Sequence, residues 1–230
     1  RKFSQFDEDG ILLYIFARIG EGTKQVLEIS IGDGRECMAA NLLINHGWRG
    51  LLFEAGDKSR KLAIEFYKYH LDTYNPPKIL DDWITKANVN ELIASGGFCG
   101  EIDLFSLDVD GNEYWFWQAL DVVSPRVVVV ESNAVIPHNL SYTSEYKDDF
   151  EMDGPYHSAS IGALVKLGQK KNYRLVGTNS KGFNLFFMRN DVGVDEFPEI
   201  SAKQAHDIWC VHENQKISWE GTKDLPWVKV

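Results

Sequence analysis

Four oxygen-bearing side chains stand where two apolar segments of the second half end. Asp108 and Asp110 come at the end of one segment, and Glu131 and Asn133 come at the end of the next one. If these segments are neighbouring strands, their ends lie about 5 Å apart and the side chains can meet at one point. Carboxylate and amide oxygens are hard ligands that suit Mg²⁺ or Ca²⁺. The spacing therefore predicts a divalent metal site held by these four residues.

A plainer interpretation of Asp110 stays open. Asp108 and Asp110 share a face only if the chain between them is still extended. However, Asp110-Gly111-Asn112 is also a typical turn sequence, in which Asp110 would cap the helix that follows. The sequence does not decide between the two interpretations.

Without a metal, proton transfer at this edge needs a general base, and histidine is the usual choice because it titrates near neutral pH. His138 and His157 lie in or beside the polar, irregular segment 136–156, which we interpret as a loop or lid. For each of them, an ordinary surface histidine is the alternative. His157 ranks ahead, although its place just before a predicted helix also suits an N-cap. Asp108 is the third candidate for the catalytic chemistry.

A glycine-containing turn in the first half predicts a second site. Glu28 lies in the apolar segment 26–31, which runs into Gly32-Asp33-Gly34, and Glu54 ends the next apolar segment 20 residues after Gly34. Glycines allow a tight turn and a close approach of the backbone to a ligand. A carboxylate at that distance accepts hydrogen bonds from both hydroxyls of a ribose. The spacing predicts a dinucleotide or adenosyl site, and the alternative is an ordinary turn beside a solvated acid.

The residues around this turn favour S-adenosylmethionine over NAD. A pyrophosphate-binding loop needs a third glycine in the pattern G-x-G-x-x-G, whereas Arg35 and Glu36 follow Gly34 here. The carboxylates of Glu28, Asp33 and Glu36 would repel a pyrophosphate. The sulfonium and ammonium groups of S-adenosylmethionine, in contrast, tolerate nearby acids.

The elements that must position these residues alternate between strand and helix patterns. Apolar segments predict five strands, at 26–31, 50–54, 78–81, 102–108 and 126–131. Periodic segments predict five helices, at 7–19, 35–46, 57–70, 88–94 and 112–121. A helix at 158–171 and an antiparallel strand pair at 173–178 and 183–189 close the pattern. Such alternation predicts an α/β fold with a doubly wound, mostly parallel sheet and helices on both faces.

The aromatic residues bear on the domain organisation. We expect one domain over residues 1–190 and a C-terminal extension over 191–230, which packs on that domain because it carries three tryptophans. The consecutive aromatics Tyr114 to Trp117 are expected to be mostly core, because one side of their helix must pack on the sheet. Trp83 follows the third predicted strand, where an adenine ring would lie, and it is a candidate for stacking on that ring.

Composition argues against several classes of partner. The net charge of −10, from 24 basic and 34 acidic residues, would repel nucleic acid and anionic membranes, so we expect neither as a partner. The cysteines Cys37, Cys99 and Cys210 are widely spaced and match no zinc motif, which suits a reducing, cytoplasmic location. The sequence has no long apolar run and no visible signal peptide, but it begins with Arg1, so a lost targeting segment stays open.

Several stretches resemble a known family. The segment 28–34 (EISIGDG) resembles the first motif of class I methyltransferases, with Ser30 where the first glycine is usual. The chain is similar to the FkbM-like branch of this family over SQFDEDGIL (4–12), GWRGLLFE (47–54), SLDVDGNEYWFWQAL (106–120), PRVVVVESN (125–133) and GFNLFFMR (182–189). The resemblance implies a Rossmann-like fold and a methyltransferase activity.

The resemblance also implies roles for single residues. It implies that Glu28, Gly32 and Gly34 line the methionine end of S-adenosylmethionine. It further implies that Glu54 binds the ribose and that Gln5 or Asp7 covers the site. In the metal-dependent O-methyltransferases that the chain resembles, a divalent ion at these strand ends binds the acceptor oxygen and lowers the pKa of its hydroxyl group.

The leading hypothesis is therefore an S-adenosylmethionine-dependent O-methyltransferase, with or without the help of Mg²⁺. Its acceptor would be a small polar molecule, such as a sugar, glycan or natural-product hydroxyl, and this class follows from the resemblance alone. One alternative is a metal-dependent sugar or nucleotide enzyme on the same sheet. Another is a non-catalytic binding module, to which Ser30 in the glycine turn points. Whether the chain forms a homo-oligomer is left open by the sequence.

Overall fold

A computed structural model describes residues 2–70, 72–152, 154–212 and 218–230. The chain divides into two compact units. The first unit comprises Arg1–Asp108 and Leu120–Val128, and the second comprises Val109–Ala119 and Val129–Val230.

The strands follow the predicted α/β pattern. Seven strands form one sheet, and one of them, β5 (Val123–Glu131), has residues in both units. Their order is β3 (Lys78–Leu80), β2 (Arg49–Phe53), β1 (Gln25–Ile29), β4 (Gly100–Leu107), β5, β8 (Asn184–Arg189) and β7 (Tyr173–Thr178). The sheet is mixed: β3, β2, β1 and β4 run parallel to one another, whereas β8 and β7 are antiparallel to each other. The predicted mostly parallel sheet with an antiparallel C-terminal strand pair is thus confirmed.

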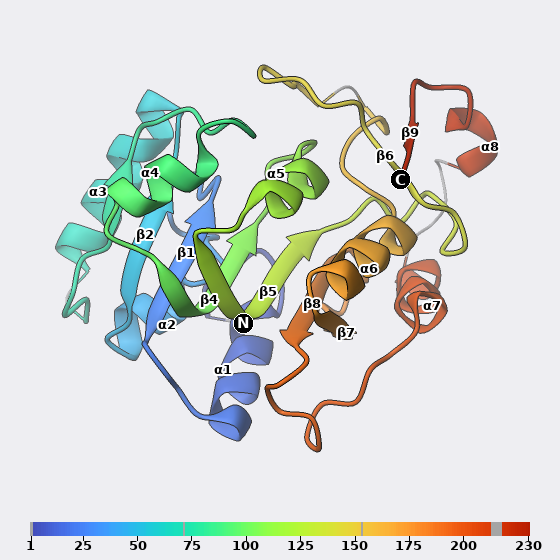
Figure 1. Cartoon of the computed structure of the whole chain (residues 1–230). Helices are drawn as coiled ribbons and strands as arrows, with labels where there is room; N and C mark the ends of the chain where they lie inside the picture. Colours follow the sequence, from blue (N-terminus) through green and yellow to red (C-terminus); the bar gives the residue numbers. More distant parts are fainter. Residues whose placement is uncertain (1, 71, 153, 213–217) are drawn as a thin grey trace. The chain divides into compact units, whose positions relative to one another are not determined.

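The first unit contains the point where the strand order reverses (Figure 1). Strand β1 (Gln25–Ile29) lies between β2 (Arg49–Phe53) and β4 (Gly100–Leu107), and it pairs with both in parallel. Strand β3 (Lys78–Leu80) continues the sheet beyond β2. In open α/β sheets, ligands bind beyond the carboxyl ends of the strands at such a reversal. The residues after β1, β2 and β4 are therefore the places to look for a site.

The helices of the first unit agree with the predicted segments, with differences at their ends. They are α1 (Glu8–Ile19), α2 (Ala40–Asn45), α3 (Asp57–Tyr69) and α4 (Val89–Ser95). The predicted helix 35–46 begins only at Ala40. The residues before it form a loop, because the backbone N–H groups of Met38 and Ala39 donate to the carboxylate of Glu28. The helix predicted at 88–94 begins one residue later than predicted, and the side chain of Asn88 before it bonds to Thr85 and Trp83 instead of capping the helix.

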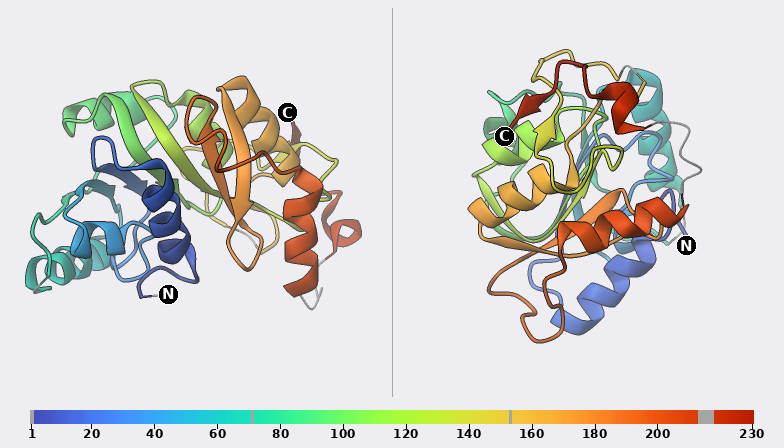
Figure 2. Two further views of the ribbon diagram at one scale, coloured as in Figure 1. Left: turned by 90° about the horizontal axis from the view of Figure 1, so that it is seen from below. Right: turned by 90° about the vertical axis from the view of Figure 1, so that its right-hand side faces the viewer.

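The second unit is built around a β-hairpin. Strands β7 (Tyr173–Thr178) and β8 (Asn184–Arg189) pair in antiparallel register, and α6 (Ile161–Lys170) and α7 (Ala202–His212) both pack against β7 (Figure 2). Helix α5 (Glu113–Ala119) contacts α6. Three of the four consecutive aromatics on α5 are buried, and Trp117 stacks on Phe187 of β8, which confirms their assignment to the core.

The C-terminal segment packs within the second unit. Strand β9 (Val228–Lys229) pairs antiparallel with β6 (Tyr142–Thr143), and α8 (Trp219–Thr222) precedes it. The ring of Trp227 lies 4.8 Å from that of Tyr156, and the ring of Trp219 lies 5.7 Å from that of Tyr142. Trp219 and Trp227 therefore pack on aromatic side chains of the second unit, and the predicted domain boundary at residue 190 stays a prediction.

The length and the apolar character of a helix decide whether it can span a membrane. A membrane-spanning helix needs about 20 predominantly apolar residues. No helix in the described part of the chain combines that length with that apolar character.

Candidate functional site

The turn after β1 has an unusual backbone. Ser30, Gly32 and Gly34 all have positive φ angles, of 67°, 57° and 82°. A side chain at Gly34 would also collide with α3, because its Cβ would lie 2.9 Å from the ring of Tyr67. The hydroxyl of Tyr67 donates to the carbonyl of Gly34 at 3.2 Å. Glycine is thus required at Gly34, and the turn is fixed from its buried side.

Glu28 holds the far end of the same loop. Its side chain is buried, and its carboxylate accepts hydrogen bonds from the backbone N–H groups of Met38 at 2.8 Å and Ala39 at 3.0 Å and from the thiol of Cys37 at 3.0 Å. Burial raises the pKa of Glu28, and these hydrogen bonds oppose the rise. The observed role of Glu28 is therefore to clamp the loop, and its predicted contact with a methionine group stays a prediction.

Glu54 and the glycine turn lie together at the strand ends. One carboxylate oxygen of Glu54 accepts from the N–H of Gly32 at 2.8 Å, and the other accepts from the N–H of Gly56 at 2.9 Å. Glu54 is half-buried, and each of its oxygens keeps a second lone pair for another donor. The structure thus brings together Glu54 and the glycine turn, which the sequence analysis combined into one site. Binding of a ribose there stays a prediction.

Two further cofactor candidates lie on the surface of the first unit. Trp83 follows β3 and is 55% exposed, so its ring is accessible to a ligand. Gln5 is exposed in the segment before α1, where Asp9 accepts hydrogen bonds from the N–H groups of Lys2 and Phe3. Their predicted contacts with a cofactor stay predictions.

Three of the four predicted metal ligands lie together. One carboxylate oxygen each of Asp108, Asp110 and Glu131 can be chosen so that all three lie within 4.8 Å of one another. Asp110 has a positive φ angle of 56°, so the chain is not extended through this residue. The prediction that Asp108 and Asp110 come together only if the chain between them is extended is therefore wrong. A left-handed turn at Asp110 places the two carboxylates close together instead.

Glu113, which the sequence analysis did not single out, shapes this turn. It is the first residue of α5 and is fully buried. Its carboxylate reaches back to accept from the N–H of Val109 at 2.9 Å and from the N–H of Gly111 at 3.0 Å. Burial raises its pKa. Glu113 thus holds the turn that precedes α5. The alternative that the sequence left open was a cap on this helix by Asp110.

Asn133 is engaged by the segment that leads to His157. Its amide nitrogen donates to the carbonyls of Pro155 at 2.9 Å and His157 at 3.0 Å, and its amide oxygen accepts from the N–H of Val135 at 3.1 Å. The residue is buried. These bonds give Asn133 a positioning role in the structure, and metal ligation by its oxygen stays a prediction.

The two histidine candidates have different surroundings. His157 is half-buried, and its Nδ1 lies 3.0 Å from the hydroxyl of Ser158, which in turn donates to Glu131 at 3.2 Å. Burial lowers the pKa of His157, and the nearby Asp110 partly opposes this. His138 instead faces His206 of α7, with 5.5 Å between the ring centroids. His157 is thus the histidine that the structure connects to the acids.

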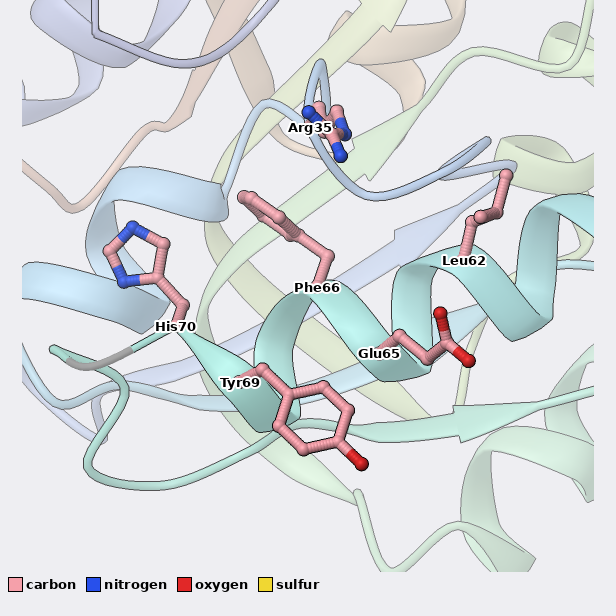
Figure 3. Close-up of a pocket in the computed structure, with 6 residues that line it drawn as sticks. All are labelled: Arg35, Leu62, Glu65, Phe66, Tyr69 and His70. Carbon is pink, nitrogen blue, oxygen red and sulfur yellow. The ribbon is translucent and has the colours of Figure 1, made fainter.

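A groove with a volume of about 320 Å³ runs along α3 (Figure 3). Five of its labelled side chains come from α3 and its C-terminal end, and Arg35 comes from the loop after the glycine turn. The guanidinium of Arg35 lies 5.7 Å from the ring centroid of Phe66. The lining shares no residue with the predicted sites. It consists of Arg35, Leu62, Glu65, Phe66, Tyr69 and His70.

Comparisons with known proteins bear on the fold. No protein-family model and no curated protein sequence matches the chain. Among solved structures, the O-methyltransferase from Bacillus cereus in complex with S-adenosylhomocysteine (SAH) is similar, with a TM-score of 0.51 and 16% identity over 79% of this chain and 79% of that one. The N-terminal domain of EvdMO1 with SAH bound has a TM-score of 0.52 and 12% identity over 81% of this chain and 82% of that one. The chain has the fold of S-adenosylmethionine-dependent methyltransferases. At these identities, the similarity shows the fold alone.

Proposed function

We propose that the chain is an S-adenosylmethionine-dependent O-methyltransferase. The observation that carries the proposal is the hydrogen bond between Glu54 and the N–H of Gly32, at the end of the strands where the sheet order reverses. It places a half-exposed carboxylate beside a left-handed glycine turn. The methyltransferase fold supports the same cofactor, and both structures compared above hold SAH.

The residues of the first unit fit this cofactor chemically. No atom lies within 4 Å of a Cβ built on Gly32, so the backbone of the turn is open to a ligand. The free lone pairs of Glu54 suit the two ribose hydroxyls, and the exposed ring of Trp83 suits an adenine. S-adenosylmethionine supplies a methyl group on a positively charged sulfur. Acidic side chains near the turn, such as Asp33, favour that charge.

Methyl transfer to a hydroxyl group requires that a proton leaves the acceptor. In this proposal, the acceptor oxygen forms a bond to the methyl carbon with one of its lone pairs, and the electrons of the broken carbon–sulfur bond stay on the sulfur. The acceptor proton moves to Nε2 of His157, which burial keeps neutral by lowering the pKa of the side chain. The products are the methyl ether, SAH and a protonated His157.

The carboxylates of Asp108, Asp110 and Glu131 have the donor chemistry for Mg²⁺. Their oxygen atoms are near enough to share one ion. They would hold the ion where it can lower the pKa of an acceptor hydroxyl. We include Mg²⁺ in the proposal as an assisting ion.

We further propose a sugar hydroxyl as the acceptor. This part rests on the resemblance of the sequence to FkbM-like proteins and on one similar structure. The N-terminal domain of EvdMO1 was also determined in the presence of SAH and D-fucose, and it matches this chain with a TM-score of 0.51 and 11% identity. The accessible carboxylates of Asp110 and Glu131 can accept hydrogen bonds from the hydroxyls of such a ligand.

Calorimetric titration with S-adenosylmethionine and with SAH, each with and without Mg²⁺, tests the proposal. We expect dissociation constants in the micromolar range for both. Binding of Mg²⁺ without any binding of either adenosyl compound would favour the sugar or nucleotide enzyme instead. No binding of any of the three to folded protein would favour the non-catalytic module.

A further inference from the structure

We infer that Ser158 is a positioning residue that fixes the tautomer of His157, and this inference rests on the proposed role of His157 as the base. The hydroxyl of Ser158 lies between two partners. It is 3.0 Å from Nδ1 of His157 and 3.2 Å from a carboxylate oxygen of Glu131. A base at Nε2 requires that the ring proton is on Nδ1, so the direction of these two hydrogen bonds decides whether His157 is ready to accept a proton.

The hydrogen-bonding capacity of the three groups sets that direction. A hydroxyl group has one proton to donate, and a carboxylate can only accept. The Ser158 proton therefore goes to Glu131, and the hydroxyl oxygen must accept from Nδ1–H of His157. The buried carboxylate of Glu113 offers a second acceptor for the same hydroxyl proton, so either choice leaves the Ser158 oxygen as the acceptor for His157. Nε2 is then left with a free lone pair.

The backbone around Ser158 holds its hydroxyl in place. Ser158 is fully buried and has a positive φ angle of 50°, which is uncommon for a residue other than glycine. Its carbonyl accepts from the N–H of Ser144 at 3.0 Å. The carbonyl of His157 accepts from the side chain of Asn133 at 3.0 Å, and the carbonyl of Ala159 accepts from the N–H of Asn133 at 2.8 Å. The strained conformation is thus supported from two sides, as expected where a structure over-determines it.

The two nitrogens of the imidazole ring differ in their partners. His157 is half-buried, and within the described ranges the one hydrogen bond of its ring is that between Nδ1 and Ser158. Ser158, in contrast, is fully buried. A serine nucleophile must be accessible to its substrate, so this set of serine, histidine and acid suits a base held by a serine better than a serine activated by a base. Nε2 of His157 is therefore the ring nitrogen to which we assign the acceptor proton.

Long-range ¹H–¹⁵N correlation spectra of the imidazole nitrogens test the inference without any need for methyl transfer. They are recorded above the ordinary histidine pKa of about 6.5, and the His157 signals are assigned by their loss in His157→Gln. In the unmodified protein, we expect Nδ1 to be protonated and Nε2 to be unprotonated. In Ser158→Ala, we expect a mixture of tautomers or a shift of the proton to Nε2.

Ser158→Gly is the second variant, because glycine adopts the left-handed backbone readily and keeps the fold if alanine does not. A proton that stays on Nδ1 in Ser158→Gly would overturn the inference. The loss of the serine should also lower kcat by about 10-fold or more, up to the factor of about 10²–10⁴ that a whole general base contributes, while the dissociation constant of SAH stays the same. If the unmodified protein carries the ring proton on Nδ1 but does not bind SAH, the inference on Ser158 stands and only the proposed function is contradicted.

Discussion

The turn after β1 and the turn at 109–111 are both held by a buried glutamate, but from opposite directions. Glu28 precedes its loop and reaches forward to the N–H groups of Met38 and Ala39. Glu113 follows its turn and reaches back to Val109 and Gly111. Burial raises the pKa of both side chains. In each region, a carboxylate with no access to solvent organises the backbone beside acids that are accessible.

The difference lies in what each turn presents. The first turn contains two glycines and offers open backbone beside Glu54, which suits a ligand that needs a close approach. The second turn carries Asp110 and offers side chains, together with Glu131. In the proposed function, the first region would hold the cofactor and the second would act on the acceptor. Substitutions in the two regions should therefore separate binding from chemistry.

The largest effect is expected from His157→Gln. Because a general base contributes about 10²–10⁴-fold to a rate, kcat for methyl transfer should fall by that factor, whereas the dissociation constant of SAH should not change. The measurement is transfer of a labelled methyl group to a panel of sugars. His138→Gln is the matched control, because His138 faces α7. Equal losses in the two variants would contradict the distinction between them.

Glu54→Gln should weaken the binding of the cofactor and not the methyl-transfer step. Hydrogen bonds to a charged group contribute about 1.5–3 kcal/mol, so the dissociation constant of SAH in calorimetry should rise by about 10- to 100-fold. Glu196→Gln, at an exposed position of the second unit, is the control and should bind normally. An unchanged affinity in Glu54→Gln would show that the adenosyl compound binds elsewhere.

Gly111→Ala tests the packing of the second turn. A Cβ at Gly111 would lie 2.1 Å from the ring of Phe150, so the variant should lose about 1–3 kcal/mol of unfolding free energy. Gly10→Ala is the control, because nothing lies within 4 Å of its Cβ in α1 and alanine there should stabilise the helix by about 0.5–1 kcal/mol. Urea denaturation of both variants measures this, and equal stabilities would mean that Phe150 moves aside freely.

Glu28→Gln should show the smallest effect, in the pH dependence of stability. Since the pKa of Glu28 is raised in the folded state from its ordinary value of 4.5, the folded protein binds this proton more tightly than the unfolded chain does. Its contribution to stability is therefore full below pH 4.5 and is lost as the pH rises through the folded value. The cost of Glu28→Gln should accordingly decrease with rising pH in denaturation series. A cost that increases with pH would mean that the folded pKa is lowered.

Much of the fold could be predicted from the sequence, because the strands of the sheet are continuous apolar runs. Val127 to Val130 are fully buried, as expected for a strand that is covered on both faces. The start of α2 could not be predicted, because it depends on where the carboxylate of Glu28 reaches in three dimensions. A helix pattern in the sequence contains no information on such a bond.

The candidate site was predictable only in part. The rule that ligands bind at strand ends placed Glu54 near Gly32 and placed Asp108, Asp110 and Glu131 in one group. Glu113 and Ser158 were missed for a physical reason. The bonds of Glu113 depend on a left-handed turn at Asp110, and the hydroxyl of Ser158 bonds to Glu131, which lies far away in the sequence. The left-handed conformation of Ser158 is uncommon for a residue other than glycine. An acid directly before a run of aromatics, as at Glu113, was the one signal available.

A crystal structure of the protein with SAH tests the central claim most directly. The account predicts that both ribose hydroxyls donate to the carboxylate of Glu54 and that the amino-acid end of the ligand lies along the turn from Ser30 to Gly34. Density for SAH in the groove along α3, with Glu54 bonded only to Gly32 and Gly56, would contradict it.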